Sequence, residues 1–307
     1  MSESKAGINL DTNKNTQKDS SQIRTFVFPM HGWIGLILVA VFWWVNWGTE
    51  GMRTYWAFFP LWLGYIFLVD AFAVRIGRPS IVKKYRTFFL LFLISIPSWW
   101  IFEFVNDRVD YWRYLGQDVF SPFERNFWKT VCFSTVVPAV FVTANLFQGI
   151  KWFRRHHFQL QAGKTHAGRV SYFIIGWGML AFVFLVPQYG MAFLWISIFF
   201  ILDPINYWLK RPSILRQTAV GDWRTVILFF AATLFCGFFW ELWNIYSWPK
   251  WIYTFPFLNG LKVFEMPLAG YLGYLPFGLE LFAMVAFLAP WVNIEVLKFT
   301  GEMHIPE

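Results

Sequence analysis

Apolar residues occur along this chain in blocks of about 20 residues, the length a helix needs to cross a bilayer core of roughly 30 Å. Short polar connections separate these blocks. The alternation of polar and apolar positions that is typical of barrel strands is missing. We therefore predict an all-α polytopic membrane protein with eight transmembrane helices, at residues 31–49, 55–75, 86–106, 130–149, 171–188, 191–209, 224–246 and 268–291.

The two halves of the chain carry the same short motifs in the same order. Features of the first half recur in the second at a nearly constant displacement: Trp62 and Asp70 as Trp195 and Asp203, Arg78-Pro79-Ser80 as Arg211-Pro212-Ser213, and Pro138 as Pro276. We predict two parallel four-helix repeats, residues 27–160 and 161–307, related by a pseudo-twofold axis along the membrane normal. Residues 1–26 are polar without apolar periodicity, which predicts a disordered cytoplasmic tail.

Composition and charge support a membrane location and give the expected orientation. Only 14% of the residues are charged, against about a quarter in soluble domains, while 57% are hydrophobic. The formal net charge is +8, and basic residues gather before the first predicted span and after the second, fourth and sixth. The positive-inside rule then places both termini in the cytoplasm and leaves no reason to expect nucleic acid as a partner. We expect an integral protein of a bacterial or archaeal inner membrane.

The most informative motif stands twice, each time at the end of an apolar block. It consists of an aromatic residue, a glutamate, two apolar residues and an asparagine, followed after a short gap by Trp-x-Tyr. The acid and the amide share a helix face, because residues i and i+3 are neighbours on a helix. The members are Glu103, Asn106, Trp112 and Tyr114 in the first copy and Glu241, Asn244, Trp251 and Tyr253 in the second.

Ionisable residues at membrane depth are costly and are therefore often functional. We predict that Glu103 and Glu241 face each other or a shared cavity and act as proton donors or acceptors. The two asparagines would orient a substrate or the carboxyl groups, and the Trp-x-Tyr residues would contact the substrate. The alternative is structural: each glutamate pairs with a loop arginine such as Arg108 or Arg113 and locks the end of its helix.

A third candidate acid, Glu280, belongs to one half only. It stands one helical turn after Pro276 in a glycine-containing stretch, and Val142 occupies the equivalent place in the first half. A proline inside a helix frees a backbone carbonyl that can line a cavity, and small residues allow close helix approach. We predict a catalytic role for Glu280, against a structural hydrogen bond to Tyr271, Tyr274 or a neighbouring helix.

Asp70 and Asp203 end their spans shortly before the two Arg-Pro-Ser turns, near the expected cytoplasmic face. The favoured interpretation is a lock, in which each aspartate bonds an arginine or the backbone of the turn. A lipid head-group or phosphate site made by the arginines is the alternative.

Two stretches carry motifs that point to a known family. One is the Asp…Arg-x-Gly run Asp70-Ala71-Phe72-Ala73-Val74-Arg75-Ile76-Gly77, and the other is Trp251-Ile252-Tyr253 followed by Pro276 and Glu280. Both resemble the small integral-membrane lycopene cyclases, which are built from three-helix units and have a helix that opens with proline and adjacent acids. The resemblance implies acid–base work on a carotenoid polyene, with Glu280 as the acid. The chain departs from that family because Glu280 is alone, one turn beyond the proline, and each half has four spans.

The leading functional hypothesis is a membrane-embedded enzyme or binding protein with a cavity for a lipid or an isoprenoid such as a carotenoid. The 20 Trp, 12 Tyr and 38 Phe residues offer polarizable apolar walls that suit such a ligand. Two alternatives stay open: a transporter or channel that uses the same carboxylates, and a structural or pigment-binding subunit of a membrane complex or homo-oligomer. Membrane lipids are expected partners. The His and Cys spacing fits no metal-ligand pattern, so no metal is predicted, and the cofactor is left unknown.

Overall fold

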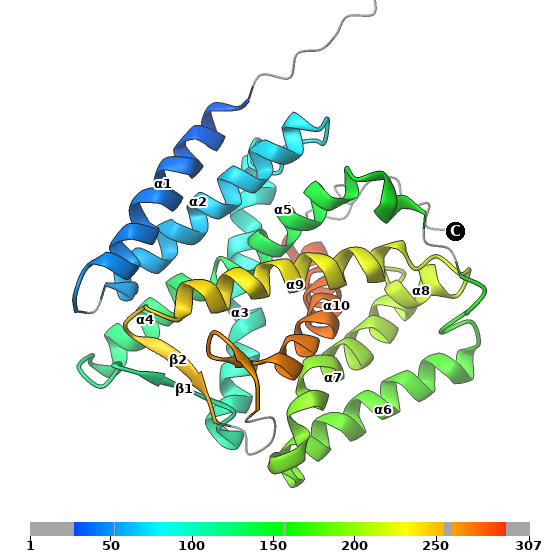
Figure 1. The fold of residues 1–307 in the computed structure, drawn as a ribbon. Helices are drawn as coiled ribbons and strands as arrows, with labels where there is room; N and C mark the ends of the chain where they lie inside the picture. The colour runs from blue at the N-terminus through cyan, green and yellow to red at the C-terminus, as the bar shows by residue number, and fades with distance from the viewer. Residues whose placement is uncertain (1–27, 52, 156–157, 255–259, 293–307) are drawn as a thin grey trace, which may run out of the picture.

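The computed structural model describes residues 28–51, 53–155, 158–254 and 260–292. These residues are mostly helical, and they contain eight segments long and apolar enough to cross a membrane (Figure 1). The prediction of eight helical segments of this length and hydrophobicity is confirmed, and they are compatible with an integral membrane protein. The tail predicted at residues 1–26 lies outside the described residues.

Six of the eight spans are single helices: α1 (Met30–Gly48), α2 (Thr54–Arg75), α3 (Tyr85–Val109), α6 (His166–Leu185), α7 (Pro187–Trp208) and α9 (Arg224–Asn244). The other two are interrupted. The fourth joins α4 (Pro122–Phe133) to α5 (Val136–Gln148), and the eighth joins the 3-10 helix η2 (Leu268–Gly273) to α10 (Tyr274–Leu288) and η3 (Ala289–Val292). The connections contain η1 (Lys151–Arg154) and α8 (Ile214–Thr218).

The fourth span begins at Pro122, earlier than the predicted residue 130. Ser121 caps α4, since its hydroxyl accepts from the Glu124 N–H at 3.3 Å while the Glu124 carboxylate accepts from the Ser121 N–H at 3.0 Å. This capping box, with proline in the first turn, starts a helix whose first turns are polar, and hydrophobicity alone misses them. The break between α4 and α5 precedes Pro138, whose ring would clash with a carbonyl one turn earlier.

The described chain also contains two short antiparallel strand pairs, so the prediction of an all-α fold is wrong in this respect. β1 (Trp112–Leu115) pairs with β2 (Lys250–Tyr253), with Trp112 opposite Tyr253 and Tyr114 opposite Trp251. β3 (Lys262–Val263) pairs with β4 (Met266–Pro267). The β1–β2 ribbon therefore holds the two Trp-x-Tyr motifs side by side, although they are far apart in the sequence (Figure 1).

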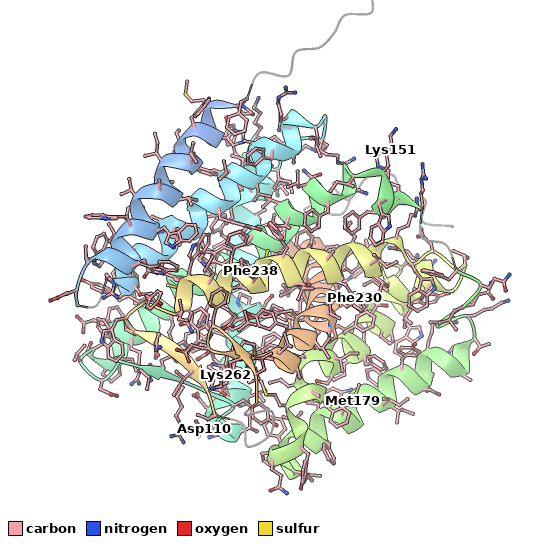
Figure 2. The ribbon with its side chains drawn as sticks, in the orientation of Figure 1. Asp110, Lys151, Met179, Phe230, Phe238 and Lys262 are labelled. Atoms are coloured by element: carbon pink, nitrogen blue, oxygen red, sulfur yellow. The ribbon has the colours of Figure 1, made fainter. Side chains whose placement is uncertain are left out.

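The helices form two outer pairs around a packed interior. α1 lies along α2, and α6 lies along α7, while α5 contacts α2, α3 and α9, and α10 contacts α7 and α9. Glycines bring the first pair close together: a Cβ on Gly35 would lie 2.7 Å from the Gly64 carbonyl oxygen. Side chains fill the spaces between the ribbons (Figure 2), although some aromatic side chains of α9, such as Phe238, are exposed.

The lock predicted at each Arg-Pro-Ser turn is confirmed. Asp70 accepts from the Ser80 hydroxyl at 2.6 Å and the Ile81 N–H at 2.7 Å. Asp203 accepts from the Ser213 hydroxyl at 2.9 Å and the Ile214 N–H at 2.8 Å. Both aspartates are fully buried, and each one satisfies the backbone that follows its own helix.

Candidate functional site

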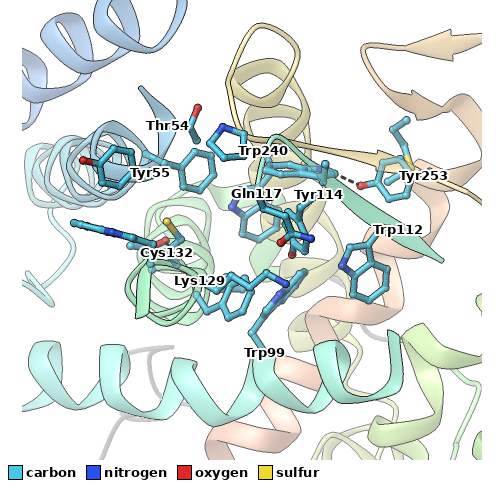
Figure 3. A pocket seen from close by; sticks show the side chains of 18 of the residues that line it. Thr54, Tyr55, Trp99, Trp112, Tyr114, Gln117, Lys129, Cys132, Trp240 and Tyr253 are labelled. Atoms are coloured by element: carbon cyan, nitrogen blue, oxygen red, sulfur yellow. Dashed lines mark hydrogen bonds between the residues drawn. The ribbon is translucent and has the colours of Figure 1, made fainter. Parts of the chain in front are cut away.

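A cavity lies between the β1–β2 ribbon and the ends of the surrounding helices (Figure 3). The space between its lining side chains is about 1280 Å³, with its opening included. A large, mainly apolar cleft with a few converging polar groups is typical of a small-molecule site. Its apolar wall includes Tyr55, Phe58, Trp99, Phe120, Trp128, Phe133, Trp195, Trp240 and Phe277.

The structure places all four predicted Trp-x-Tyr aromatics in the wall of this one cavity. Trp112 and Tyr114 come from β1, and Trp251 and Tyr253 come from β2. Residues two apart on a strand project to the same face, so each motif presents both of its rings together. The carboxyl groups of Glu103 and Glu241 are not part of the lining but bond its members, since they accept from the Tyr114 and Tyr253 hydroxyls.

Glu103, near the end of α3, is held by donors on both of its carboxyl oxygens. Its Oε1 accepts from the Tyr114 hydroxyl at 2.6 Å and the Trp112 indole N–H at 3.0 Å. Its Oε2 accepts from the Lys129 ammonium at 2.9 Å. The structural alternative predicted that Glu103 pairs with a loop arginine. The glutamate does form an ion pair, but its partner is Lys129 of α4. Arg113 instead pairs with Asp110.

Glu241, near the end of α9, is fully buried and is held differently. Its Oε1 accepts from the Tyr253 hydroxyl at 2.6 Å and the Tyr274 hydroxyl at 2.7 Å. The other oxygen, Oε2, is buried without a hydrogen-bond partner among the described residues. No ion pair of Glu241 occurs in that part of the chain either, because Lys250 pairs with Glu265.

No protein-family model, curated protein or solved structure matches this chain. Geometry and chemistry alone therefore indicate what the site does. The described residues contain no group of three or more His, Cys, Asp and Glu side chains that could hold a metal ion.

The difference between the two glutamates has a simple origin in the sequence. Aligning Phe123-Glu124 with Phe264-Glu265 places Gly270 where the first half has Lys129. Both residues line the cavity, but glycine offers no cation. Tyr274, at the start of α10, supplies a hydroxyl to Glu241 in its place. One acid therefore faces an ammonium group and the other faces two phenols.

The two strand tyrosines keep their protons under ordinary conditions. Burial, and then the adjacent Glu103 carboxyl, hold the pKa of Tyr114 well above its usual range. Burial and the adjacent Glu241 carboxyl do the same for the pKa of Tyr253. Both hydroxyls therefore act as hydrogen-bond donors to the acids behind them.

The two asparagines bond the strands, not the cavity. The Asn106 amide donates to the Trp112 carbonyl at 2.8 Å, and its oxygen accepts from the Tyr111 N–H at 2.8 Å and the Trp112 N–H at 3.1 Å. Asn244 donates to the Trp251 carbonyl at 2.8 Å and accepts from the Trp251 N–H at 3.0 Å. These contacts position the Trp-x-Tyr aromatics. A direct role in orienting a substrate stays a prediction.

Glu280 lies away from the cavity wall, buried between α10 and α7. Its Oε1 accepts from the Ile198 N–H at 3.0 Å, which is the helix-to-helix contact that the structural alternative described. Tyr271 and Tyr274 bond other groups, the Val263 carbonyl and Glu241. The other carboxyl oxygen of Glu280, Oε2, has no hydrogen-bond partner among the described residues. A catalytic role for Glu280 stays a prediction.

Several polar residues that line the cavity were not predicted as site residues, among them Lys129, Tyr274, Arg125 and Gln117. Lys129 and Arg125 belong to the polar start of α4, which hydrophobicity left outside the fourth span. Lys129 stands directly before the predicted start of that span, and this lone cation was the one available signal. Tyr274 and Gln117 follow no pattern that would separate them from packing or loop residues.

Proposed function

We propose that this protein binds a lipid or an isoprenoid in the aromatic cavity and carries out acid–base chemistry there with Glu241. One observation carries the proposal: Glu241 is a buried carboxyl group that donor tyrosines of an apolar cavity wall bond at one oxygen, while its other oxygen has no partner among the described residues. A buried carboxylate without a cation is costly, so we infer that Glu241 holds a proton in the resting protein.

The chemistry follows from how the wall is built. Tyr253 and Tyr274 lie between Glu241 and the cavity, so a proton can pass between the carboxyl group and a bound molecule through either hydroxyl. The rings of Trp240 and Trp195 also belong to the wall. Aromatic faces stabilise positive charge, as would develop on a protonated double bond.

Glu103 has a different part in this proposal. Its pairing with Lys129 satisfies the charge, and its bonds to Trp112 and Tyr114 fix the facing wall. We assign it a polar anchoring role. The resemblance to lycopene cyclases suggested Glu280 as the acid, whereas the cavity favours Glu241, with Glu280 as a polar contact between helices.

The same geometry supports the predicted repeat. In the β1–β2 register, Trp112 lies opposite Tyr253, and Trp251 lies opposite Tyr114. Each tryptophan therefore faces the tyrosine of the other motif, so the register is unchanged when the two motifs are exchanged. A twofold axis perpendicular to the ribbon produces this pattern, and the two aspartate locks repeat it at the other end of the helices. We infer two parallel four-helix repeats with both termini cytoplasmic, in a bacterial or archaeal inner membrane, so that the cavity opens on the opposite side.

A transporter receives less support from the packing. Trp195 and Phe277 of the cavity wall contact the fully buried Phe102, with ring centroids 5.3 Å and 5.5 Å from it. The inner end of the cavity is thus closed by packed aromatic rings, and these rings are continuous with the packed interior of the protein.

Mass spectrometry of small molecules that copurify with the protein, with an absorption spectrum, tests the proposal. Cys132→Trp would fill the cavity, and Val41→Trp adds the same ring at an exposed position of α1 as a control. A polyene, quinone or defined lipid should accompany the wild type and Val41→Trp but be depleted from Cys132→Trp. Equal bulk phospholipid in all three proteins would contradict the proposal.

Glu241→Gln tests the chemical step once the retained molecule is known. It should still retain the ligand but slow its conversion by about a hundredfold to ten-thousandfold, the usual contribution of a positioned acid or base. Full conversion by Glu241→Gln would restrict the function to binding.

A further inference from the structure

We propose that the ligand of this cavity is an amphiphile with an anionic head group, and that Arg125 holds this group at the cavity mouth. The inference deepens the proposed function and rests on it. The relevant residues are those polar residues of the cavity that the Glu241 chemistry does not use.

Arg125 and Lys129 lie one turn apart on α4, on the same helix face, and both line the cavity. The Lys129 charge is matched by Glu103 at 2.9 Å, and its ammonium lies 4.1 Å from the centre of the Tyr114 ring. In the part of the chain that the structure describes, the Arg125 guanidinium has no hydrogen bond or ion pair. Arg125 therefore leaves a positive charge on the wall without a counter-charge.

The nearest acid in the sequence does not neutralise Arg125. The Glu124 carboxylate accepts from the Ser121 N–H at 3.0 Å and the Ser121 hydroxyl at 2.8 Å, as part of the capping box. Arg125 is only half-buried, so its guanidinium stays partly solvated in the absence of a ligand. A phosphate or carboxylate would fit the fork of its donors in a bidentate manner.

Gln117 is a second polar residue of the cavity wall (Figure 3). Its side-chain oxygen is buried and lacks a hydrogen-bond partner among the described residues. A head group that carries both oxygens and a hydroxyl, such as a phosphate monoester, can accept from Arg125 and donate to Gln117. The remaining wall is aromatic and suits the apolar chain of the same molecule.

Cys132 provides a natural reporter for the test, because its thiol lines the cavity whereas Cys236 is buried in the interior. Alkylation of Cys132 in the purified protein, followed by peptide mass spectrometry, measures occupancy. The probes are farnesyl monophosphate, farnesol and inorganic phosphate. In the wild type, farnesyl monophosphate should protect Cys132 at a concentration about tenfold to a hundredfold lower than farnesol, as expected for one charged hydrogen-bonded contact.

Arg125→Gln should remove this preference while leaving protection by farnesol unchanged, and Arg125→Lys should retain part of it. Arg108→Gln removes an exposed arginine at the end of α3 and should behave like the wild type. Equal protection by the phosphate and the alcohol in the wild type would overturn this inference but not the proposed function. Protection by inorganic phosphate alone would also overturn it, in favour of a free-phosphate site. Protection by neither farnesyl probe would overturn both.

Discussion

The two Glu-x-x-Asn…Trp-x-Tyr units share one framework but differ in how they hold the acid. In both units the asparagine bonds the strand backbone and the tyrosine hydroxyl donates to the glutamate at 2.6 Å. The first unit adds the Lys129 ammonium, and the second adds the Tyr274 hydroxyl. In the proposed function, the first unit keeps its acid as a charged structural partner, and the second leaves its acid for chemistry.

The largest effect on stability should come from breaking the charged unit. Glu103→Gln leaves the Lys129 ammonium, only 18% exposed, without its partner, which should lower the free energy of unfolding by about 3–5 kcal/mol. Glu241→Gln exchanges one set of neutral hydrogen bonds for another and should cost about 1 kcal/mol or less. Thermal unfolding of the purified variants in detergent measures the difference.

The double variant Glu103→Gln/Lys129→Met is the matched control. It removes the stranded charge, so it should recover much of the stability lost in Glu103→Gln. If Glu241→Gln is as damaging as Glu103→Gln, the two acids have the same structural role and the contrast between the units is lost.

An intermediate effect is expected at the asparagines. Replacing either asparagine by alanine leaves backbone groups of the Trp-x-Tyr strand without hydrogen-bond partners. This should lower the free energy of unfolding by about 1–3 kcal/mol. Asn106 makes three such bonds and Asn244 makes two, so Asn106→Ala should be the more destabilising. Equal wild-type stability in both variants would show that the strands hold their positions without the amides. Chemical denaturation followed by near-ultraviolet circular dichroism of the aromatic wall reports on both units.

The smallest effect concerns the residue before each Trp-x-Tyr motif, Tyr111 in one unit and Lys250 in the other. Burial raises the pKa of Tyr111 to about 12, and its hydroxyl donates to the Pro187 carbonyl at 2.8 Å. Between pH of about 10 and about 12 the unfolded chain loses this proton while the folded chain keeps it, so stability falls as pH rises.

Tyr111→Phe removes one contributor and should make this alkaline loss of stability less steep. Other buried tyrosines also contribute, so only part of the slope should disappear. Unfolding midpoints measured across this pH range test the prediction. An unchanged slope in Tyr111→Phe would mean that its hydroxyl titrates at the same pH in both states.

The spans could be predicted from the sequence alone, because membrane helices are recognised by the length and hydrophobicity of their segments. The sequence also singled out Glu103 and Glu241 together as candidate site residues, since their motif is repeated at a nearly constant displacement. The pairing of β1 with β2 could not be predicted, because four-residue strands far apart in the chain leave no periodic signal. Lys129 was missed for a related reason: α4 starts with polar turns that are defined by the Ser121 cap and not by hydrophobicity.

The distinction between the two acids also required the structure. The two motifs have the same sequence pattern. The residues that make the surroundings of the two glutamates different, Lys129 and Tyr274, lie outside the repeated motif. Glu280 shows the converse. It stood out in the sequence because it lacks a counterpart, yet in the structure it bonds the backbone of α7 at Ile198.

Infrared spectroscopy of the carboxyl groups can show whether Glu241 carries a proton while Glu103 is ionised, as we propose. The difference spectrum between the wild type and Glu241→Gln at neutral pH should show the loss of a protonated carboxyl C=O stretching band. The spectrum of Glu103→Gln should retain that band and lose carboxylate absorption instead. Loss of the protonated band in Glu103→Gln, or its full retention in Glu241→Gln, would contradict the account.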